Sequence, residues 1–441
     1  MQHRITILAG LLALGLNLSG GAKAAGSNSY DMTILVANDA KYKPTVMVDP
    51  DLINPWGIAL RPPGIGGHIW TSNAGSGTTT TYIGDVGGKP LYQDGLKVIP
   101  ISQAKGVEAY TPQVTGQVYN AASDIAGQPT EFFVSGAATN WNTGAAAGTI
   151  SGSAKFVFVT LDGTINAWRA GTNPGMNEAV VVKDFSGNWA GANGYQYTPN
   201  FTGVAMTTAG FKLDAGGNKV ADNRLYATDF ANNRIMTFDN QWNDISASVH
   251  FERPNDLQND FMPFNIQDIG GRLYVAYAAS EYDPLMPSEP VRAPAHGRVI
   301  AYDRDGHIVQ DFKDQLDMNA PWGLAMAPTT FGAYGGKLLV ANFGDGSVAA
   351  LDPETGATLG KLKDAQGKNI FIDGIWGLTF GNGVGLGDAN SLYFTAGPNL
   401  EEDGILGKLT VSAVPEPESY ALMLGGLGLL AWKARRRQTK R

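Results

Sequence analysis

Residues 54–60 read NPWGIAL, and variants of this phrase recur along the chain. Three close copies and two divergent ones follow it: NFTGVAM (200–206), APWGLAM (320–326), DGIWGLTF (373–380), MPFNIQ (262–267) and TEFFVSG (130–136). Recurrence of one phrase at intervals of this size indicates a repeat architecture built from one supersecondary unit. The sequence therefore predicts six units.

Each phrase is followed by two further segments with the composition of β-strands. The second phrases are HIWTSN (68–73), KFVFVT (155–160), RLYATD (224–229), RLYVAY (272–277), KLLVAN (337–342) and SLYFTA (391–396). The third phrases are TTTTYI, TINAW, NRIMTFD, GRVIAYD, GSVAALD and ILGKLTV. Short β-rich runs that close on Asp-Gly or similar turns indicate antiparallel meanders. Residues 101–129 and 170–199, rich in Gly, Ala, Asn and Gln, are expected to be long loops.

One meander cannot bury both of its faces, but several arranged around an axis bury them against each other. We therefore predict an all-β fold, a six-bladed β-propeller spanning residues 25–413, with four strands in each blade over residues 30–412. The glycine of the repeated phrase is expected on the innermost strand, where backbones crowd. Residues 31–37 (DMTILVA) are placed to complete the last blade. A pair of β-sandwiches is the alternative, and it does not explain the repeated phrase.

The first 24 residues have the pattern of an export signal. Arg4 precedes an apolar run, and Ala22-Lys23-Ala24 provides a small-residue cleavage pattern. We predict a signal helix over residues 1–24 and an exported mature protein. The chain contains no cysteine, which excludes disulfides and a cysteine nucleophile.

The last 28 residues, 414–441, combine three features in order. Pro415, Glu416 and Pro417 precede an apolar run at 420–432, and a basic cluster with Arg435, Arg436 and Arg437 ends the chain. The run is shorter than the roughly 20 residues of a comfortable membrane span. Basic residues stay on the cytoplasmic side. We expect a short C-terminal transmembrane helix that anchors the precursor transiently in the inner membrane, with an ordinary tail anchor as the alternative.

This arrangement closely resembles the PEP-CTERM sorting signal of Gram-negative bacteria. The resemblance implies recognition and cleavage by an exosortase, followed by release to the cell surface or the extracellular space, in an exopolysaccharide setting. The body resembles NHL-type propellers, most clearly in ATDFANNRIMTFD (227–239), and an uncharacterised family of exported propellers that carry PEP-CTERM signals. It is also distantly similar to gluconolactonases, which hold a divalent cation with Glu, Asn and Asp side chains. The inner phrases NPWG, FTG, PFN, PWG and GIWG contain no glutamate, which weakens that similarity.

The net charge of the body limits the kinds of partner that it can bind. The full chain carries −8, the first 24 residues carry two bases, and residues 415–441 carry six bases against two acids, so the body carries −14. An acidic body argues against nucleic acid as a partner. We expect the export machinery, the exosortase and an extracellular glycan or protein ligand instead.

The candidate ligand site lies at the channel. Three tryptophans precede glycine at equivalent places, and an aromatic rim of this kind suits stacking on a sugar ring, although packing between blades explains them as well. The residues proposed for this site are Asn54, Trp56, Asn265, Trp322, Asp373 and Trp376. No zinc-protease, nucleophile-elbow or P-loop motif is present in the sequence.

Two function classes follow. We favour a non-catalytic binding or matrix protein over an enzyme. The alternative is a metal-dependent hydrolase of the lactonase type, for which Asp51 and Asp373 with Asn54 and Asn265 are the available ligands. No cofactor is firmly predicted. Calcium is the ion that the acidic run 401–403 would suit, but an exposed hairpin loop is the favoured interpretation of that run.

Overall fold

The computed structural model describes the propeller body. The described residues are 29–62, 65–105, 110–124, 129–171, 173–187, 197–207, 211–213, 216–217, 219–281, 289–313 and 317–412. The predicted signal helix (1–24) and C-terminal transmembrane helix (414–441) lie outside them. Within the described part of the chain, no helix is long and apolar enough to cross a membrane.

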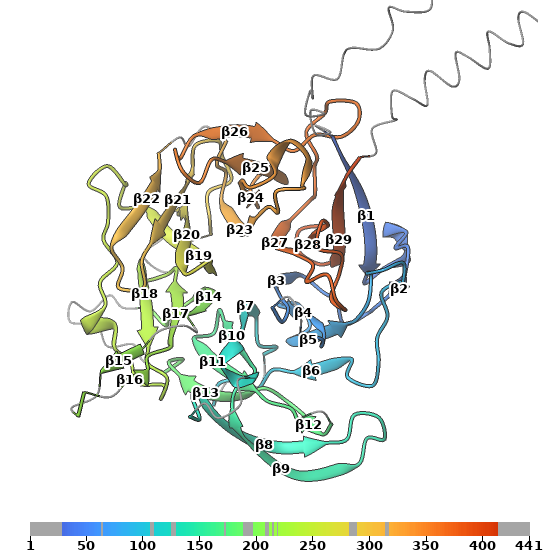
Figure 1. The fold of residues 1–441 in the computed structure, drawn as a ribbon, viewed down its shortest axis with the longest axis vertical. Coiled ribbons are helices and arrows are strands. Elements are labelled where there is room, and N and C mark those ends of the chain that lie inside the picture. The colour runs from blue at the N-terminus through green and yellow to red at the C-terminus, as the bar shows by residue number, and fades with distance from the viewer. Residues whose placement is uncertain are drawn as a thin grey trace, which may run out of the picture.

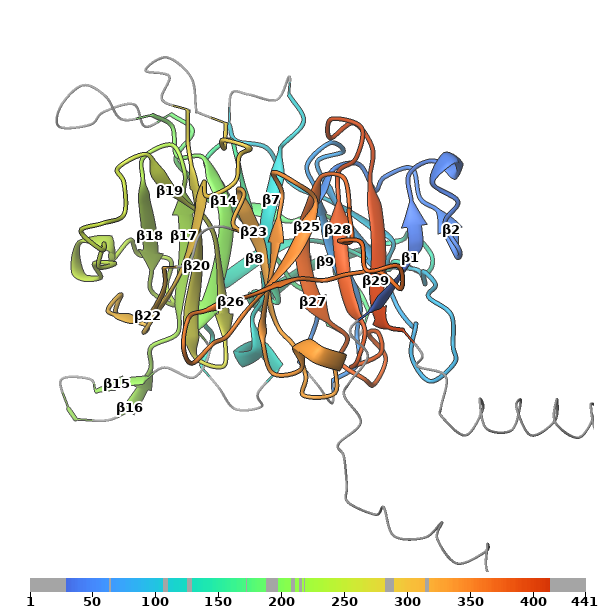
Figure 2. The same cartoon turned by 90° about the horizontal axis from the view of Figure 1, so that it is seen from above.

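Six sheets radiate from a central axis, and the six-bladed prediction is confirmed (Figure 1). The innermost strands are β3 (Pro55–Ala59), β7 (Val114–Tyr119), β14 (Phe201–Thr207), β19 (Phe261–Ile269), β23 (Pro321–Met326) and β27 (Ile375–Phe380). Seen from the side, the strands run from one face of the disc to the other (Figure 2). Trp56, Gly203, Trp322 and Trp376 all lie on inner strands, as predicted.

The second and third phrases form the middle of each blade. Second strands are β4 (Ile69–Asn73), β10 (Phe156–Thr160), β17 (Arg224–Asp229), β20 (Arg272–Ala279), β24 (Leu338–Asn342) and β28 (Leu392–Ala396). Third strands are β5 (Thr78–Tyr82), β11 (Thr164–Trp168), β18 (Arg234–Phe238), β21 (Gly297–Tyr302), β25 (Ser347–Leu351) and β29 (Ile405–Val411). Outer strands are β6 (Val98–Pro100), β13 (Val180–Asp184), β22 (Ile308–Phe312) and β26 (Thr358–Lys361). The side chains of β10, β24 and β28 are fully buried, because both faces of a blade pack on neighbouring blades.

The N-terminal strand closes the ring. β1 (Tyr30–Ala37) pairs antiparallel with β29, from Tyr30 opposite Val411 to Ala37 opposite Ile405, and β2 (Met47–Val48) adds a short parallel strand outside it. The predicted closing segment 31–37 is therefore confirmed. Both ends of the propeller leave at the same edge, where Ser412 N–H donates to the Ser29 carbonyl at 2.9 Å.

Two expectations were wrong. The inner strand of the second blade is β7, within the stretch assigned as a loop, and not 130–136, which enters β8 (Phe133–Thr139) of an inserted hairpin. β7 begins with Val-Thr-Gly and lacks the tryptophan of the repeated phrase, so the phrase was not recognised there. Its glycine still lies where the next blade is close, because a Cβ on Gly116 would lie 2.7 Å from Val204 N. The four-strand expectation also fails in the third blade, where β14, β17 and β18 form the sheet of the described residues.

Insertions decorate this scaffold. β8 pairs with β9 (Ala146–Ser153) and β12 (Gly175–Met176) outside the second blade, and β15 (Phe211–Leu213) pairs with β16 (Lys219–Ala221) beyond the third. Short 3-10 turns occur at Ala40–Tyr42, Ala121–Asp124, Ser246–Ser248 and Gly332–Tyr334. The insertions leave the channel-lining strands in a regular ring, and these strands position the site.

Candidate functional site

An aromatic cluster occupies the middle of the channel. We call it the aromatic plug; its members are Trp56, Phe230, Phe264, Trp322, Phe343 and Trp376. Trp56 stacks on Trp376 with ring centroids 3.6 Å apart, and Phe343 stacks on Trp376 at 3.9 Å. Trp322 meets both other tryptophans edge-on, at 6.0 and 5.8 Å. The three tryptophans are 6%, 4% and 1% exposed, so they pack chiefly against each other.

The local backbone explains why these indoles meet. In each of the three strands the pairing register shifts across the Trp-Gly pair, between Pro55 and Ile58, between Pro321 and Leu324, and between Ile375 and Leu378. A β-bulge bends its strand and re-aims the side chain it carries. Glycine follows because the neighbouring blade is close: a Cβ on Gly323 would lie 2.2 Å from the carbonyl oxygen of Trp376.

A cavity of about 320 Å³ opens on the side of the plug where Asn54 and Glu401 lie. We call it the tryptophan-side cavity, because Trp56 and Trp376 line it. Asn54, just before β3, links the plug to the rim of this cavity, where Glu289, Arg292 and Glu401 lie. Its Oδ1 accepts from Trp376 Nε1 at 3.1 Å, and its Nδ2 donates to Glu401 Oε2 at 3.0 Å. Asn54 has φ 46°, a left-handed conformation that asparagine tolerates better than most residues. Its position between an indole and a carboxylate fixes Glu401 at the rim.

Charge gathers at the rim of this tryptophan-side cavity. Arg292 Nη2 lies 3.2 Å from Glu401 Oε1, and its guanidinium lies over the ring of Phe343 at 4.1 Å. Burial raises the pKa of Glu401; the nearby Glu289 carboxylate also raises it, while the bonds to Asn54 and Arg292 oppose the shift. Two carboxylates with one guanidinium leave the rim acidic.

Several polar groups of this cavity are not used by the fold. Trp56 Nε1 is buried and has no hydrogen-bond partner among the described residues. The side-chain amides of Gln113 and Asn200 also line the cavity, and within the described chain neither makes a hydrogen bond. Donors and acceptors left free around an aromatic floor can bind a ligand that carries both kinds of group.

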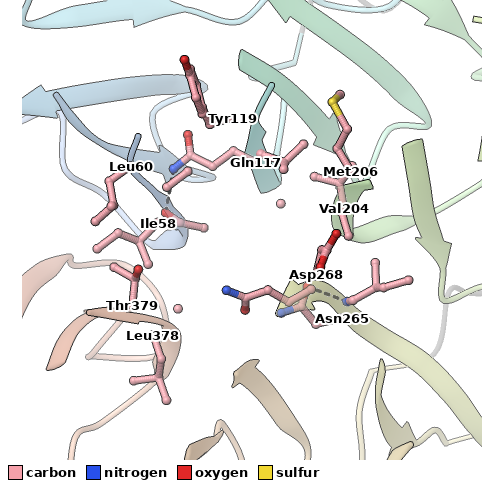
Figure 3. Close-up of a pocket in the computed structure, with 18 of the residues that line it drawn as sticks. Ile58, Leu60, Gln117, Tyr119, Val204, Met206, Asn265, Asp268, Leu378 and Thr379 are labelled. Atoms are coloured by element: carbon pink, nitrogen blue, oxygen red, sulfur yellow. Dashed lines mark hydrogen bonds between the residues drawn. The ribbon is translucent and has the colours of Figure 1, made fainter. Parts of the chain in front are cut away.

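A second cavity, of about 610 Å³, opens on the opposite side of the plug; we call it the axial cavity (Figure 3). Its lining residues come from all six inner strands, β3, β7, β14, β19, β23 and β27. The labelled apolar residues are Ile58, Leu60, Val204, Met206 and Leu378.

The polar groups of the axial cavity are largely engaged. Gln117 Nε2 donates to the carbonyl oxygens of Gly57 at 3.1 Å and Trp70 at 2.6 Å, while its Oε1 is buried without a partner among the described residues. Asn265 Nδ2 donates to the Trp322 carbonyl at 2.8 Å. Burial raises the pKa of Asp268, which accepts one backbone bond. This cavity therefore offers mainly apolar contact.

The six residues proposed from the sequence do not form one site. Asn54, Trp56 and Trp376 meet at the tryptophan-side cavity, whereas Asn265 and Trp322 line the axial cavity on the other side of the plug. Asp373 is exposed, accepts from the backbone of Asn399 at 3.1 Å and borders a surface pocket with Met32 and Phe371.

Sequence reasoning missed the rim. The sequence predicts a calcium site or an exposed loop for residues 401–403, whereas Glu401 binds Asn54 and Arg292, and Asp403 binds the N-terminal segment. Arg292, Phe343 and Asn200 come from loops of different blades, and their spacing in sequence carries no signal. Among the residues that the structure describes, no three His, Cys, Asp or Glu side chains form a group that could hold a metal ion.

The polar side chains of segment 227–239 stabilise the β17–β18 hairpin itself. Asp229 is fully buried and accepts from Arg234 Nε at 2.8 Å, from Asn232 Nδ2 at 2.8 Å and from Asn200 N at 3.1 Å. These bonds tie β17 to β18 and to the start of β14. They also fix the backbone of Asn200, whose side chain lines the tryptophan-side cavity.

Comparison with known proteins identifies the C-terminal segment. Residues 413–437 match the family model of the PEP-CTERM protein-sorting motif. The chain carries a PEP-CTERM sorting signal. The match includes the triplet 415–417 and the arginines 435–437, which lie outside the described residues. Such a motif marks a protein of Gram-negative bacteria for export with a membrane-anchored signal and for exosortase-mediated sorting.

Relatives of the body are distant. An uncharacterised protein of Acanthamoeba polyphaga mimivirus is 27% identical over 383 residues, covering 86% of this chain and 80% of that protein. Another from the same virus is 26% identical over 368 residues, covering 83% and 82%. Among solved structures, a glucose dehydrogenase matches with TM-score 0.42 and 14% identity over 87% of this chain and all of that one. The PQQ-bound aldose sugar dehydrogenase of Streptomyces coelicolor matches with TM-score 0.39 and 12% identity over 88% of this chain and all of that one.

Proposed function

We propose that this exported, PEP-CTERM-sorted propeller is processed by an exosortase and then acts as a non-catalytic binding or matrix protein at the cell surface or in exopolysaccharide. Its ligand is a glycan, held in the tryptophan-side cavity. The acidic body and the export signal support an extracellular role without nucleic acid.

One observation carries this proposal: the tryptophan-side cavity presents hydrogen-bonding groups that the fold leaves free, beside an aromatic floor. The amides of Gln113 and Asn200 can donate and accept, and Glu401 can accept. Sugar hydroxyls both donate and accept, and the C–H face of a pyranose packs on aromatic rings. The volume of about 320 Å³ lies within the usual range of ligand pockets.

The alternative, a lactonase-type hydrolase, needs several oxygen ligands that converge on one ion. Asn54 and Asn265 lie on opposite sides of the plug, and both side chains are already hydrogen-bonded. Asp373 is exposed at a separate surface pocket. The binding role is therefore better supported than the hydrolase.

The test measures binding of the processed protein to purified exopolysaccharide of the producing bacterium and to oligosaccharides hydrolysed from it. The double variant Gln113→Ala with Asn200→Ala removes two free amides, so we expect roughly 30-fold weaker binding, on the basis of about 1 kcal/mol for each hydrogen bond. Gln366→Ala, an exposed amide elsewhere, is the matched control and should bind like wild type.

Two results would contradict the proposal. Unchanged affinity in the double variant would remove the tryptophan-side cavity as the glycan site. Metal-dependent hydrolysis of a sugar lactone that disappears in Asp373→Ala would replace the binding role with an enzymatic one.

A further inference from the structure

The β8–β9 hairpin is a long insertion beside the second blade; the other inserted hairpin of the described chain, β15–β16, has strands of only three residues. Figure 1 shows the β8–β9 hairpin outside the second blade, at the rim of the disc, with β9 outermost. One face of β8 is anchored, because Val134 and Ala138 are buried and Val134 joins the core of the second blade. β9 itself is exposed along most of its length.

β9 is an open edge strand. Its pairing with β8 is regular from Phe133 opposite Ser153 to Ala137 opposite Thr149. Among the described residues, β8 is the strand that pairs with it, and its other edge has no partner strand. Alternate residues of an edge strand point backbone N–H and C=O groups outward, which makes the edge a template for another strand.

The other outer strands of the propeller carry protection that β9 lacks. Charged residues or proline occur on each: Pro100 on β6, Lys183 and Asp184 on β13, Arg234 on β18, Asp311 on β22 and Lys361 on β26. β2 is only two residues long. By contrast, residues 132–154 contain no charged residue and no proline. Proteins block edge pairing with charge, proline, shortness and β-bulges. The register of β9 shifts between Ala146 and Thr149, but Thr149–Ser153 pairs regularly and carries neither charge nor proline, so this half of the strand is the pairing surface.

We propose that β9 is a self-association edge, which pairs antiparallel with β9 of a second copy of this chain. The body carries −14, so two copies repel each other over most of their surface, and the uncharged hairpin is where they approach at least electrostatic cost. Pairing of one strand with itself about a two-fold axis gives a closed, isologous dimer, the commonest oligomer symmetry. Apart from Ile150, the side chains of β9 are those of alanine, glycine, serine and threonine, and their small size allows close approach.

The first test compares dimerisation of the processed protein and of the variant Thr149→Lys with Ser151→Lys by sedimentation velocity over a concentration series. Lysines on an edge strand oppose each other across the pair, so we expect the dimer to weaken by about tenfold or more. Val309→Lys and Leu359→Lys place the same charge on exposed positions of β22 and β26, and they should dimerise like wild type.

The second test uses the absence of cysteine in the chain. Single variants Thr149→Cys and Ser151→Cys should form disulfide-linked dimers under mild oxidation, fastest for the residue nearest the two-fold axis, whereas Leu359→Cys should not. A wild-type protein that is monomeric at every concentration would overturn the proposal. So would a dimer that the β9 lysines leave intact, or crosslinking that is equal at position 359.

Discussion

Asp403 is expected to control how firmly the N-terminal strand closes the ring. It lies in the loop between β28 and β29 and accepts from Asn38 Nδ2 at 3.1 Å and from Tyr42 Oη at 2.8 Å. Lys41 Nζ lies 2.7 Å from Asp403 Oδ2, the oxygen that also accepts from Tyr42, and the Asp403 side chain is only 9% exposed. All three partners belong to the segment that follows β1, so replacing Asp403 by asparagine loosens the closing strand.

The magnitude follows from the pKa. Burial opposes ionisation of Asp403, but the hydrogen bonds from Lys41, Asn38 and Tyr42 lower its pKa from 3.8 to about 2. A shift of this size stabilises the folded state by about 2 kcal/mol at neutral pH. Because the folded-state pKa is depressed, the contribution is present above about pH 4, falls to about 1 kcal/mol near pH 3 and is largely lost by pH 2.

The assay is urea unfolding of the processed protein and of Asp403→Asn at pH 7 and at pH 3. We expect the variant to lose about 2 kcal/mol at pH 7 and about half as much at pH 3. Asp39→Asn is the matched control: Asp39 contacts the same lysine at 3.7 Å but is 48% exposed, so its loss should stay below about 0.5 kcal/mol. Equal losses in the two variants, or a loss at Asp403 that does not change with pH, would refute the argument.

Three further outcomes are expected. Gly203→Ala should cost about 1–3 kcal/mol in urea unfolding, because its Cβ would lie 2.2 Å from Asn265 Oδ1 and 2.8 Å from the Asn265 Cα, while Gly187→Ala, with open space around it, should change little. Trp376→Ala should cost about 3–5 kcal/mol by the same measurement, because it removes the ring between two stacked neighbours; a loss below about 1 kcal/mol would contradict the plug as a packing centre. Replacing the triplet 415–417 by alanines should leave membrane-retained protein whose intact mass includes the tail, whereas wild-type exported protein that still holds residues 420–441 would contradict processing.

The fold could be predicted from the sequence because one physical requirement repeats on five of the six inner strands, all except β19. Strands at the axis approach each other so closely that the phrase needs a glycine at this point. Five of the six phrases could be identified in the sequence, either by this glycine or by the strand pattern around it. The sixth, at β7, keeps the glycine of Val-Thr-Gly but lacks the tryptophan, and its surroundings are rich in the residues of loops. A search that required only the glycine and a following buried strand such as β10 would have found it.

The site could be predicted only in part. Tryptophans on equivalent inner strands imply an aromatic cluster, because equivalent positions of a ring converge on its axis. Which side chains stand at each mouth depends on loops whose lengths differ between blades, and Arg292 and Glu401 are 109 positions apart in the chain. Asn54 and Asn265 show the limit of the argument: both adjoin the phrase, yet they lie on opposite sides of the plug.

The plug also determines how the channel can be used. Trp56, Trp376 and Phe343 form a continuous stack that Arg292 covers on the tryptophan side, while Trp322 faces the axial cavity. Rings at 3.6–3.9 Å are at van der Waals contact, so a chain ligand cannot thread between them unless the plug repacks. The molecule therefore presents two separate bowls instead of a pore. Their chemistry differs accordingly, with free amides and carboxylates at one and mainly aliphatic side chains at the other, so a ligand suited to one bowl lacks its partners in the other.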